Sequence, residues 1–187
     1  MGKIIKWFIT IVLGLIILSI ILSLFLVFKL TNNFKDMIEN LAVDFDTCAA
    51  LGYPVLESYP RKCRAPNEEI FIEDIGNELE KTDLIRINNP RPNQEITSPL
   101  EIKGEARGAW FFEASFPIKL LDADNKVIAI GHAEAQSEWM TEEFVPFKGT
   151  LEFSTPQTLK GKLILEKDNP SGLPEYADQL EIPVKFN

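Results

Sequence analysis

The chain begins with one unbroken hydrophobic run and ends in a long region where hydrophobic and polar positions alternate. Residues 7–28 contain no charged side chain and are bounded by Lys6 and Lys29. Because an α-helix rises about 1.5 Å per residue, this run reaches about 33 Å, enough to cross a hydrocarbon core of about 30 Å. We therefore expect residues 1–29 to comprise a short N-terminal segment and a transmembrane helix surrounded by membrane lipid.

The length and the flanks of the run predict an uncleaved anchor and its orientation. The run is longer than the apolar part of a signal peptide, about 7–15 residues, and no Ala-x-Ala site or nearby Cys follows it, so we expect no cleavage. Lys3, Lys6 and the amino terminus precede it within a short flank, a bias that favours a cytoplasmic N-terminus. The only two cysteines, Cys48 and Cys63, lie beyond the run, and disulfides persist in extracytoplasmic compartments. The sequence thus predicts a single-pass protein of the cell membrane, with an uncleaved anchor and most of the chain outside.

Residues 30–43 continue with a helical pattern. Their hydrophobic positions share one helical face, and no Gly or Pro interrupts them: Leu30, Phe34, Met37, Ile38 and Leu41. We expect the membrane helix to extend into a short helical stalk. The apolar stripe needs a cover, either from the small domain that follows or from the head-group surface. Self-association of stalks is the alternative.

Residues 44–75 read as a small module held by a disulfide between Cys48 and Cys63. Several Pro and Gly residues exclude a long helix, and the segment is too small to bury a core of its own. Closing a loop of about 15 residues contributes roughly 3 kcal/mol in the chain-entropy model. Residues 52–63, G-Y-P-V-L-E-S-Y-P-R-K-C, resemble small two-cysteine modules of bacterial envelope proteins. That resemblance implies no activity.

Residues 76–83 are polar and read as a linker, after which residues 84–187 alternate in short runs separated by turn-forming clusters. About seven short strands with few helical patterns predict an immunoglobulin-like antiparallel β-sandwich. We expect this mainly β domain to fold without the rest of the chain. The candidate strands contain the following residues: Ile85/Ile87, Leu100/Ile102, Phe116/Ile118/Leu120, Ile128/Ile130, Phe147/Leu151/Phe153, Leu163/Leu165 and Ile182/Val184/Phe186.

Four motifs in this region point to one family. They are I-x-S-P-L-x-I-x-G-x-A at 96–106, I-K-L-L-D-A-D-N-K-V-I-A at 118–129, P-F-x-G-T-L-x-F at 146–153 and V-x-F at 184–186. Together they resemble the immunoglobulin-like domain of bacterial spore-germination-type proteins, which often accompanies GerMN-type domains. Where that family has a D-A-D-G-K turn, this chain has Asn125, which also tolerates a positive φ. The resemblance implies an extracytoplasmic, non-catalytic binding or assembly module.

Charge and motifs narrow the function classes. All 28 acidic residues but only 16 of the 19 Lys and Arg follow Lys29, so the outer part has a net charge of −12, which argues against binding nucleic acid or anionic lipid head groups. The sequence contains no G-x-S-x-G, H-E-x-x-H, G-x-G-x-x-G or P-loop motif, and we assign no catalytic residue, metal ligand or cofactor. Asp122, Asp124 and Asn125 begin a calcium-loop pattern that stops after three residues, so a hairpin turn is the better interpretation.

Aromatic residues beside turns are the remaining candidates for function, namely Trp110, Phe111, Phe112, Trp139 and Phe144. They either cap the ends of the sandwich core or form an exposed patch that contacts an envelope protein or a cell-wall glycan. We expect Trp139, and less strongly Trp110, to be partly exposed. The leading hypothesis is non-catalytic binding or scaffolding in the bacterial envelope. The alternatives are an accessory subunit of a cell-wall enzyme complex and, last, an enzyme in its own right.

Overall fold

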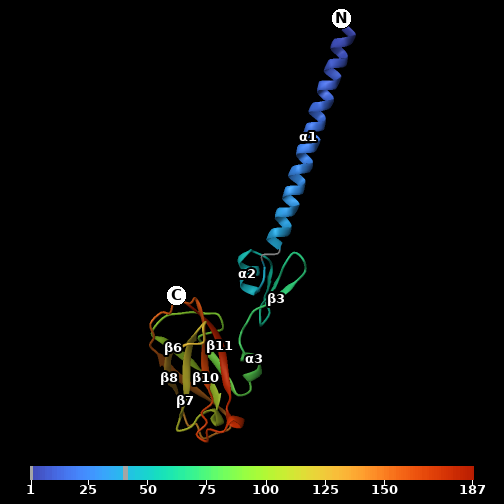
Figure 1. The fold of residues 1–187 in the computed structure, drawn as a ribbon. Helices are drawn as coiled ribbons and strands as arrows, with labels where there is room; N and C mark the ends of the chain where they lie inside the picture. Colours follow the sequence, from blue (N-terminus) through green and yellow to red (C-terminus); the bar gives the residue numbers. More distant parts are fainter. Residues whose placement is uncertain (1, 40–41) are drawn as a thin grey trace. The chain divides into compact units, whose positions relative to one another are not determined.

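The structure is a computed structural model that describes residues 2–39 and 42–187, without the side chains of residues 3–6, 8–12 and 35–39 (Figure 1). The chain divides into two compact units, Met1–Glu73 and Asp74–Asn187. The division falls close to the end of the predicted two-cysteine module.

The first element is the long helix α1 (Gly2–Glu39). Within it, Leu13–Phe34 is long and apolar enough to cross a membrane, and its side chains are exposed. The predicted apolar helix is therefore confirmed. It continues past residue 29 as expected for the stalk, up to Glu39. The rest of the predicted stalk includes Leu41, which lies outside the described residues, and the side chains of Met37 and Ile38 do so as well.

The two-cysteine module consists of one short helix and a three-stranded antiparallel sheet. Asp44 caps α2 (Phe45–Ala50), accepting the Thr47 N–H at 2.8 Å, while Thr47 Oγ1 accepts the Asp44 N–H at 3.1 Å. This reciprocal pair is a capping box, which satisfies backbone donors at the start of a helix too short to be stable alone. The strands follow in the order β1 (Val55–Leu56), β2 (Lys62–Arg64) and β3 (Ile70–Ile72).

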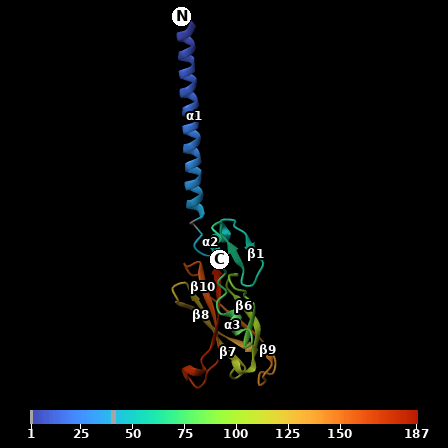
Figure 2. The same cartoon turned by 90° about the vertical axis from the view of Figure 1, so that its right-hand side faces the viewer.

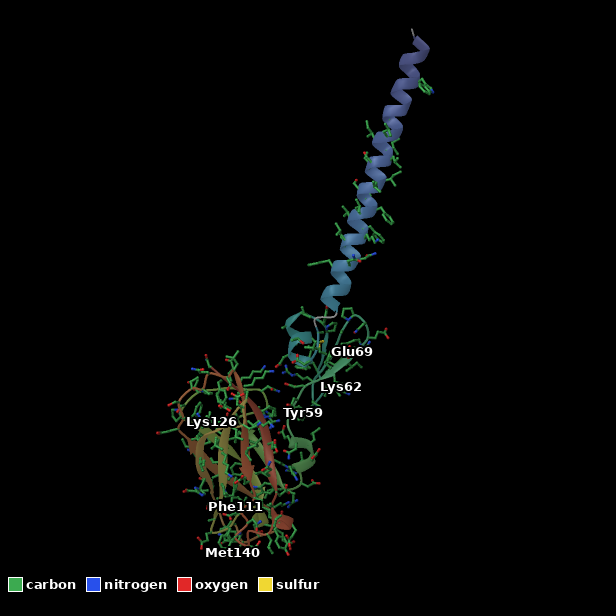
Figure 3. The ribbon with its side chains drawn as sticks, viewed as in Figure 1. Tyr59, Lys62, Glu69, Phe111, Lys126 and Met140 are labelled. Atoms are coloured by element: carbon green, nitrogen blue, oxygen red, sulfur yellow. A yellow bond between two sulfur atoms is a disulfide. The ribbon has the colours of Figure 1, made fainter. Side chains whose placement is uncertain are left out.

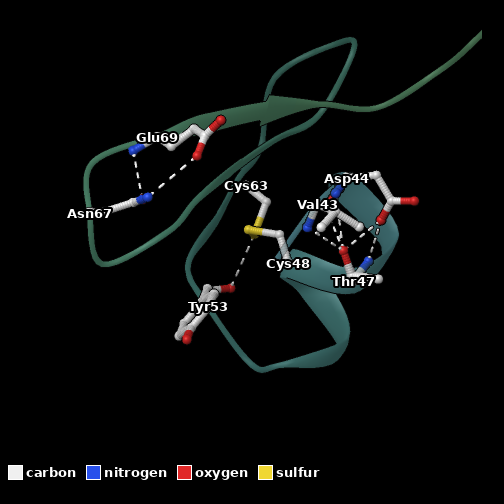
Figure 4. The surroundings of a disulfide bond; sticks show 8 residues. All are labelled: Val43, Asp44, Thr47, Cys48, Tyr53, Cys63, Asn67 and Glu69. Atoms are coloured by element: carbon white, nitrogen blue, oxygen red, sulfur yellow. Dashed lines mark hydrogen bonds between the residues drawn. A yellow bond between two sulfur atoms is a disulfide. The ribbon is translucent and has the colours of Figure 1, made fainter. Parts of the chain in front are cut away.

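The disulfide lies at the centre of this module, as Figure 4 shows. Cys48 on α2 and Cys63 on β2 are bonded, and both residues are fully buried. They pack with Ala42, Phe45 and Ala65 in a core far smaller than that of the sandwich. The predicted staple is confirmed, and it joins the helix to the middle strand of the sheet.

The second unit contains the seven expected strands and one more. The strand order is β4-β6-β9-β8-β7-β10-β11-β5, and all pairs are antiparallel except β5 with β11. The two-residue strand β5 was not predicted, because it is too short to show alternation. The strands are β4 (Ile85–Asn89), β5 (Glu95–Ile96), β6 (Leu100–Arg107), β7 (Ser115–Asp122), β8 (Val127–Ala135), β9 (Phe144–Leu151), β10 (Lys160–Glu166) and β11 (Gln179–Phe186).

The strands form two layers around one core (Figures 1 and 2). Strand β8 pairs with β7 along most of its length but with β9 only at its last three residues, from Ala133 to Ala135. The sheet folds over at this short connection. Side chains from both layers then meet in the core, where the rings of Phe116 on β7 and Phe147 on β9 lie edge to face at 5.0 Å. The predicted β-sandwich is confirmed.

The hairpin between β7 and β8 has the expected turn. Asn125 has a φ of 60°, and the buried Asp122 carboxylate accepts the N–H groups of Asp124 at 3.0 Å and Lys126 at 2.9 Å. Asn tolerates this left-handed backbone better than most residues. The Asp122 side chain, which begins the calcium-loop pattern, therefore forms hydrogen bonds within the turn.

Residues 76–83, expected to be a linker, cover the outer edge of β11. They include the short helix α3 (Glu78–Lys81). The Glu181 N–H donates to Asn77 Oδ1 at 2.7 Å, and Asn77 Nδ2 donates to the Gln179 carbonyl at 3.0 Å. Further along the same edge, the Asn93 N–H donates to the Pro183 carbonyl at 2.7 Å, and β5 pairs with the last residues of β11. An open strand edge would invite pairing with another chain, so this cover protects the sandwich.

Candidate functional site

Three loops meet at one end of the sandwich (Figures 1 and 2). They are residues 108–114, 136–143 and 167–178, and we call this region the loop end. The Asp168 N–H donates to the Trp110 carbonyl at 3.0 Å, which joins the third loop to the first. Arg107, the last residue of β6 before the first loop, donates from Nη1 to the Glu142 carbonyl at 3.0 Å, which holds the second loop beside the end of this strand. A set of loops held together on a rigid sandwich is a common location for binding residues.

Two of the candidate aromatics are part of the core. The 3₁₀ turn η1 (Gly108–Trp110) directs Trp110 inward, leaving it 2% exposed, and Phe111 is buried against Phe116 with ring centroids 5.2 Å apart. A Cβ at Gly108 would lie 2.0 Å from the Thr141 carbonyl oxygen, so the turn packs where only glycine fits. The expectation that Trp110 is partly exposed is therefore wrong. The tight turn brings these rings over the end of the core.

Phe144 is half-buried and lies beside two cations. The guanidinium carbons of Arg86 and Arg107 lie 4.0 and 4.1 Å from its ring centroid. Arg86 also donates to Glu105, and Arg107 to the carbonyl of Asp83. Cation–π contacts of this kind are attractive and use the ring faces. A sugar ring would have to displace them to stack on Phe144.

Trp139 is partly exposed, as expected, and packs against the margin of the core. Its backbone carbonyl accepts the Thr141 N–H at 2.8 Å and also faces Gly108 closely. The backbone beside the indole is thus held in place by the neighbouring loop. No structural observation tests whether Trp139 contacts a partner, and that role stays a prediction.

Large apolar side chains on the surface of the loop end come from all three loops. Phe112 is exposed beside the buried pair, and Met140 is 74% exposed at the tip of its loop (Figure 3). Leu173 and Tyr176, around the 3₁₀ turn η2 (Pro174–Tyr176), are also exposed. Sequence reasoning missed the last three. Met140 directly follows Trp139 and could have been noticed, whereas the segment of Leu173 reads as polar and Pro-rich.

Exposed carboxylates lie in the same loops as these apolar side chains. They are exposed and belong to the first two loops: Glu113, Glu138, Glu142 and Glu143. Arg107 Nη1 approaches Glu143 only at 3.9 Å, and the Glu143 side chain is 85% exposed, so the pair neutralises little of the charge. The loop end therefore offers a mixed aliphatic and aromatic surface with an acidic border.

Two further residues with side chains suited to chemistry are the single histidine of the sequence, His132, and Asp122 of the calcium-like pattern. His132 is exposed on β8, paired across the ladder with Pro117. Asp122 belongs to the hairpin turn. In the part of the chain that the structure describes, no three His, Cys, Asp or Glu residues are placed to hold a metal ion.

The comparison with known families agrees with the first three motifs, whereas V-x-F at 184–186 lies beyond the matched residues. The model of the immunoglobulin-like domain of bacterial spore germination matches residues 84–172, from just before β4 into the loop after β10. This match covers slightly less than half of the 187 residues and describes the sandwich. No curated protein and no solved structure matches the chain.

Proposed function

We propose that this chain, whose residues 84–172 are an immunoglobulin-like domain of the bacterial spore-germination type, is a membrane-anchored binding or scaffolding protein of the bacterial envelope. It acts outside the cytoplasm and without catalysis of its own. The apolar helix at Leu13–Phe34 supports the anchor, and the buried disulfide beyond it supports an oxidising compartment. The family match supports a binding or assembly domain as the outer part.

The loop end is the proposed binding surface. The observation that carries this proposal is the exposure of Phe112, Met140 and Tyr176 on three different loops held at one end of the sandwich. Large apolar side chains gathered in loops reduce solubility unless they are covered or used. Methionine adapts its shape to varied partners and is common at such surfaces.

The chemistry of the loop end favours a protein partner over a glycan. Glycan binding usually needs flat aromatic faces open to solvent, but Trp110 and Phe111 are buried and Phe144 lies beside Arg86 and Arg107. The exposed side chains are mixed in shape, and their border is acidic. A protein with an apolar patch and basic residues around it would complement this surface.

Site-specific photo-crosslinking in intact cells tests the proposal. A photoreactive residue in place of Met140, 74% exposed, is compared with one in place of Leu159, which is 78% exposed and outside the three loops. We expect a discrete protein adduct from position 140 and none from position 159. Equal adducts at both positions, or none at either, would contradict a binding role for the loop end. Retention of the outer part on purified cell-wall glycan, abolished by Trp139→Ala, would indicate the glycan alternative.

Protease added to intact protoplasts tests the topology. We expect it to remove the sandwich and to leave a membrane-embedded N-terminal fragment, because no second apolar run follows residues 7–28. A sandwich that is fully protected until the membrane is dissolved would overturn the proposed orientation.

A further inference from the structure

The three-stranded sheet of the two-cysteine module has two chemically different faces. Strand register assigns each side chain to a face, because successive residues point to opposite sides. Cys63 pairs with Val55 and Phe71, and these residues belong to the face that packs on the disulfide core. The opposite face contains Leu56, Lys62, Arg64, Ile70 and Ile72. We call it the outer sheet face.

The outer sheet face is apolar and basic. Leu56, Ile70 and Ile72 are 46%, 47% and 57% exposed, although all three are in strands. Lys62 lies in register between Leu56 and Ile72, so its alkyl chain lies between two aliphatic neighbours. Arg64 is exposed and lies opposite Ile70. Among the described residues, neither Lys62 nor Arg64 forms an ion pair.

The three strands contain no Asp or Glu, although the module is acidic. Residues 42–73 contain six Asp or Glu and three Lys or Arg. Glu73 is buried at the end of the inner face, where Arg61 Nε and Nη2 donate to its two carboxylate oxygens at 2.8 and 2.6 Å. This hydrogen bond raises the pKa of Arg61, and Glu57 raises it further by its charge. Glu73 is thus paired with Arg61, and no carboxylate of the strands lies beside Lys62 and Arg64, although the outer part of the chain as a whole is acidic.

The length of chain between the membrane helix and the module limits what can cover this face. The uncharged run ends at Phe28, the helix continues to Glu39, and the described module begins at Ala42. Residues 29–39 rise about 17 Å as a helix, and two further residues add at most about 7 Å. A module tethered this closely stays within reach of the lipid head groups. Apolar side chains combined with Lys and Arg are the pattern that binds anionic membrane surfaces.

We propose that the outer sheet face of the two-cysteine module rests on the anionic surface of the membrane that holds the anchor. Leu56, Ile70 and Ile72 enter the head-group region, and Lys62 and Arg64 contact lipid phosphates. This inference depends on the membrane anchoring in the proposed function but not on the loop end. It assigns the module a task besides connecting the helix to the sandwich, namely orienting the outer part on the membrane.

Paramagnetic relaxation in lipid nanodiscs tests this inference with the full chain. The discs contain a lipid with a gadolinium chelate on its head group, in either neutral phosphatidylcholine or a mixture with about 30% phosphatidylglycerol. We expect the amide signals of β1, β2 and β3 to broaden strongly in the anionic discs. Each surface cation changes membrane partitioning about fivefold. The double variant Lys62→Ser/Arg64→Ser should therefore lower the ratio of bound to free module about 25-fold.

Two controls make the result decisive. The variant Lys148→Ser/Lys162→Ser removes the same charge from the sandwich and should leave the broadening of β1–β3 unchanged. Unaltered chemical shifts in the α2 and β2 signals show that the module remains folded. If β1–β3 are not broadened, or are broadened equally in neutral and anionic discs, the proposal is wrong. A chain that fails to enter the discs at all would instead overturn the membrane anchor.

Discussion

The side chain of Asn77 should contribute measurably to the stability of the sandwich, although it lies outside every predicted strand. In a fragment of residues 74–187, Asn77→Ala removes an acceptor for the Glu181 N–H and a donor to the Gln179 carbonyl. Each hydrogen bond contributes about 1 kcal/mol net, and a partly buried group left without a partner adds to the loss. We expect a destabilisation of about 2–3 kcal/mol. In a domain of this size that lowers the thermal midpoint by roughly 10 °C.

Two further variants separate the hydrogen bonds from other effects. Asn77→Asp keeps an acceptor for the Glu181 N–H but cannot donate to Gln179, so it should lose about half as much stability. Gln136→Ala removes an exposed hydrogen bond to the Glu134 carbonyl and should change stability by less than about 0.5 kcal/mol. Chemical denaturation of the three variants and the parent fragment measures these differences.

Hydrogen exchange tests the same reasoning at one amide. The Glu181 N–H should be protected in the parent fragment and exchange faster in Asn77→Ala, while amides in β7 keep their protection relative to global unfolding. A fragment that starts at Leu84 also loses the buried Ile75 and should be less stable than Asn77→Ala. If Asn77→Ala matches the parent within about 0.5 kcal/mol, or if the Glu181 amide exchanges freely in both, Asn77 does not cover the edge of β11.

Three other predictions follow from particular contacts. Reducing the disulfide, which closes a separation of 15 residues, should destabilise the module by about 3 kcal/mol and leave the thermal transition of the sandwich unchanged, as followed by calorimetry with thiol labelling. Trp110→Ala should destabilise the sandwich by about 3–5 kcal/mol and Phe112→Ala by less than about 1, as measured by denaturant unfolding, and the reverse order would refute the assigned burial. The pKa of Glu101 should lie below its ordinary 4.5 because Lys103 and then Lys148 donate hydrogen bonds to it. The interaction of Glu101 with these lysines therefore stabilises the fold at a pH above the ordinary pKa, and this stabilisation is lost as the pH falls through the lowered pKa. In an NMR titration of the Glu101 carboxyl group, Lys148→Met should raise the titration midpoint.

Much of the architecture could be predicted because it depends on local patterns. The uncharged run determines a long apolar helix whatever else the chain does. Seven strands show the two-residue alternation that half-buried strands require, and all seven are found. Asn125 occupies the left-handed turn position because few other residues tolerate it. Cys48 and Cys63 are the only cysteines, so their pairing had no competitor.

The candidate site was predicted only in part, because alternation carries no information about loops. Large aromatic side chains beside turns can point inward or outward, and the 3₁₀ turn at Gly108–Trp110 decides that Trp110 and Phe111 cap the core. Phe144 is at the start of a strand, yet Arg86 and Arg107 reach its ring from elsewhere in the chain. These outcomes depend on tertiary packing that no neighbouring residue in the sequence reveals.

The sequence by itself determined the long apolar helix, the seven main strands of the sandwich and which two cysteines are joined. The tertiary structure decided which strand edges are covered and which surfaces remain open. Asn77 reads as part of a polar linker, and it acts as a strand partner only because the fold brings the edge of β11 beside it. Lys62 and Arg64 alternate with Cys63 in a strand of three residues, and only the pairing of β1, β2 and β3 places them with exposed aliphatic side chains. Local periodicity sets the face of a strand, whereas the neighbours of that face are set by residues distant in the chain.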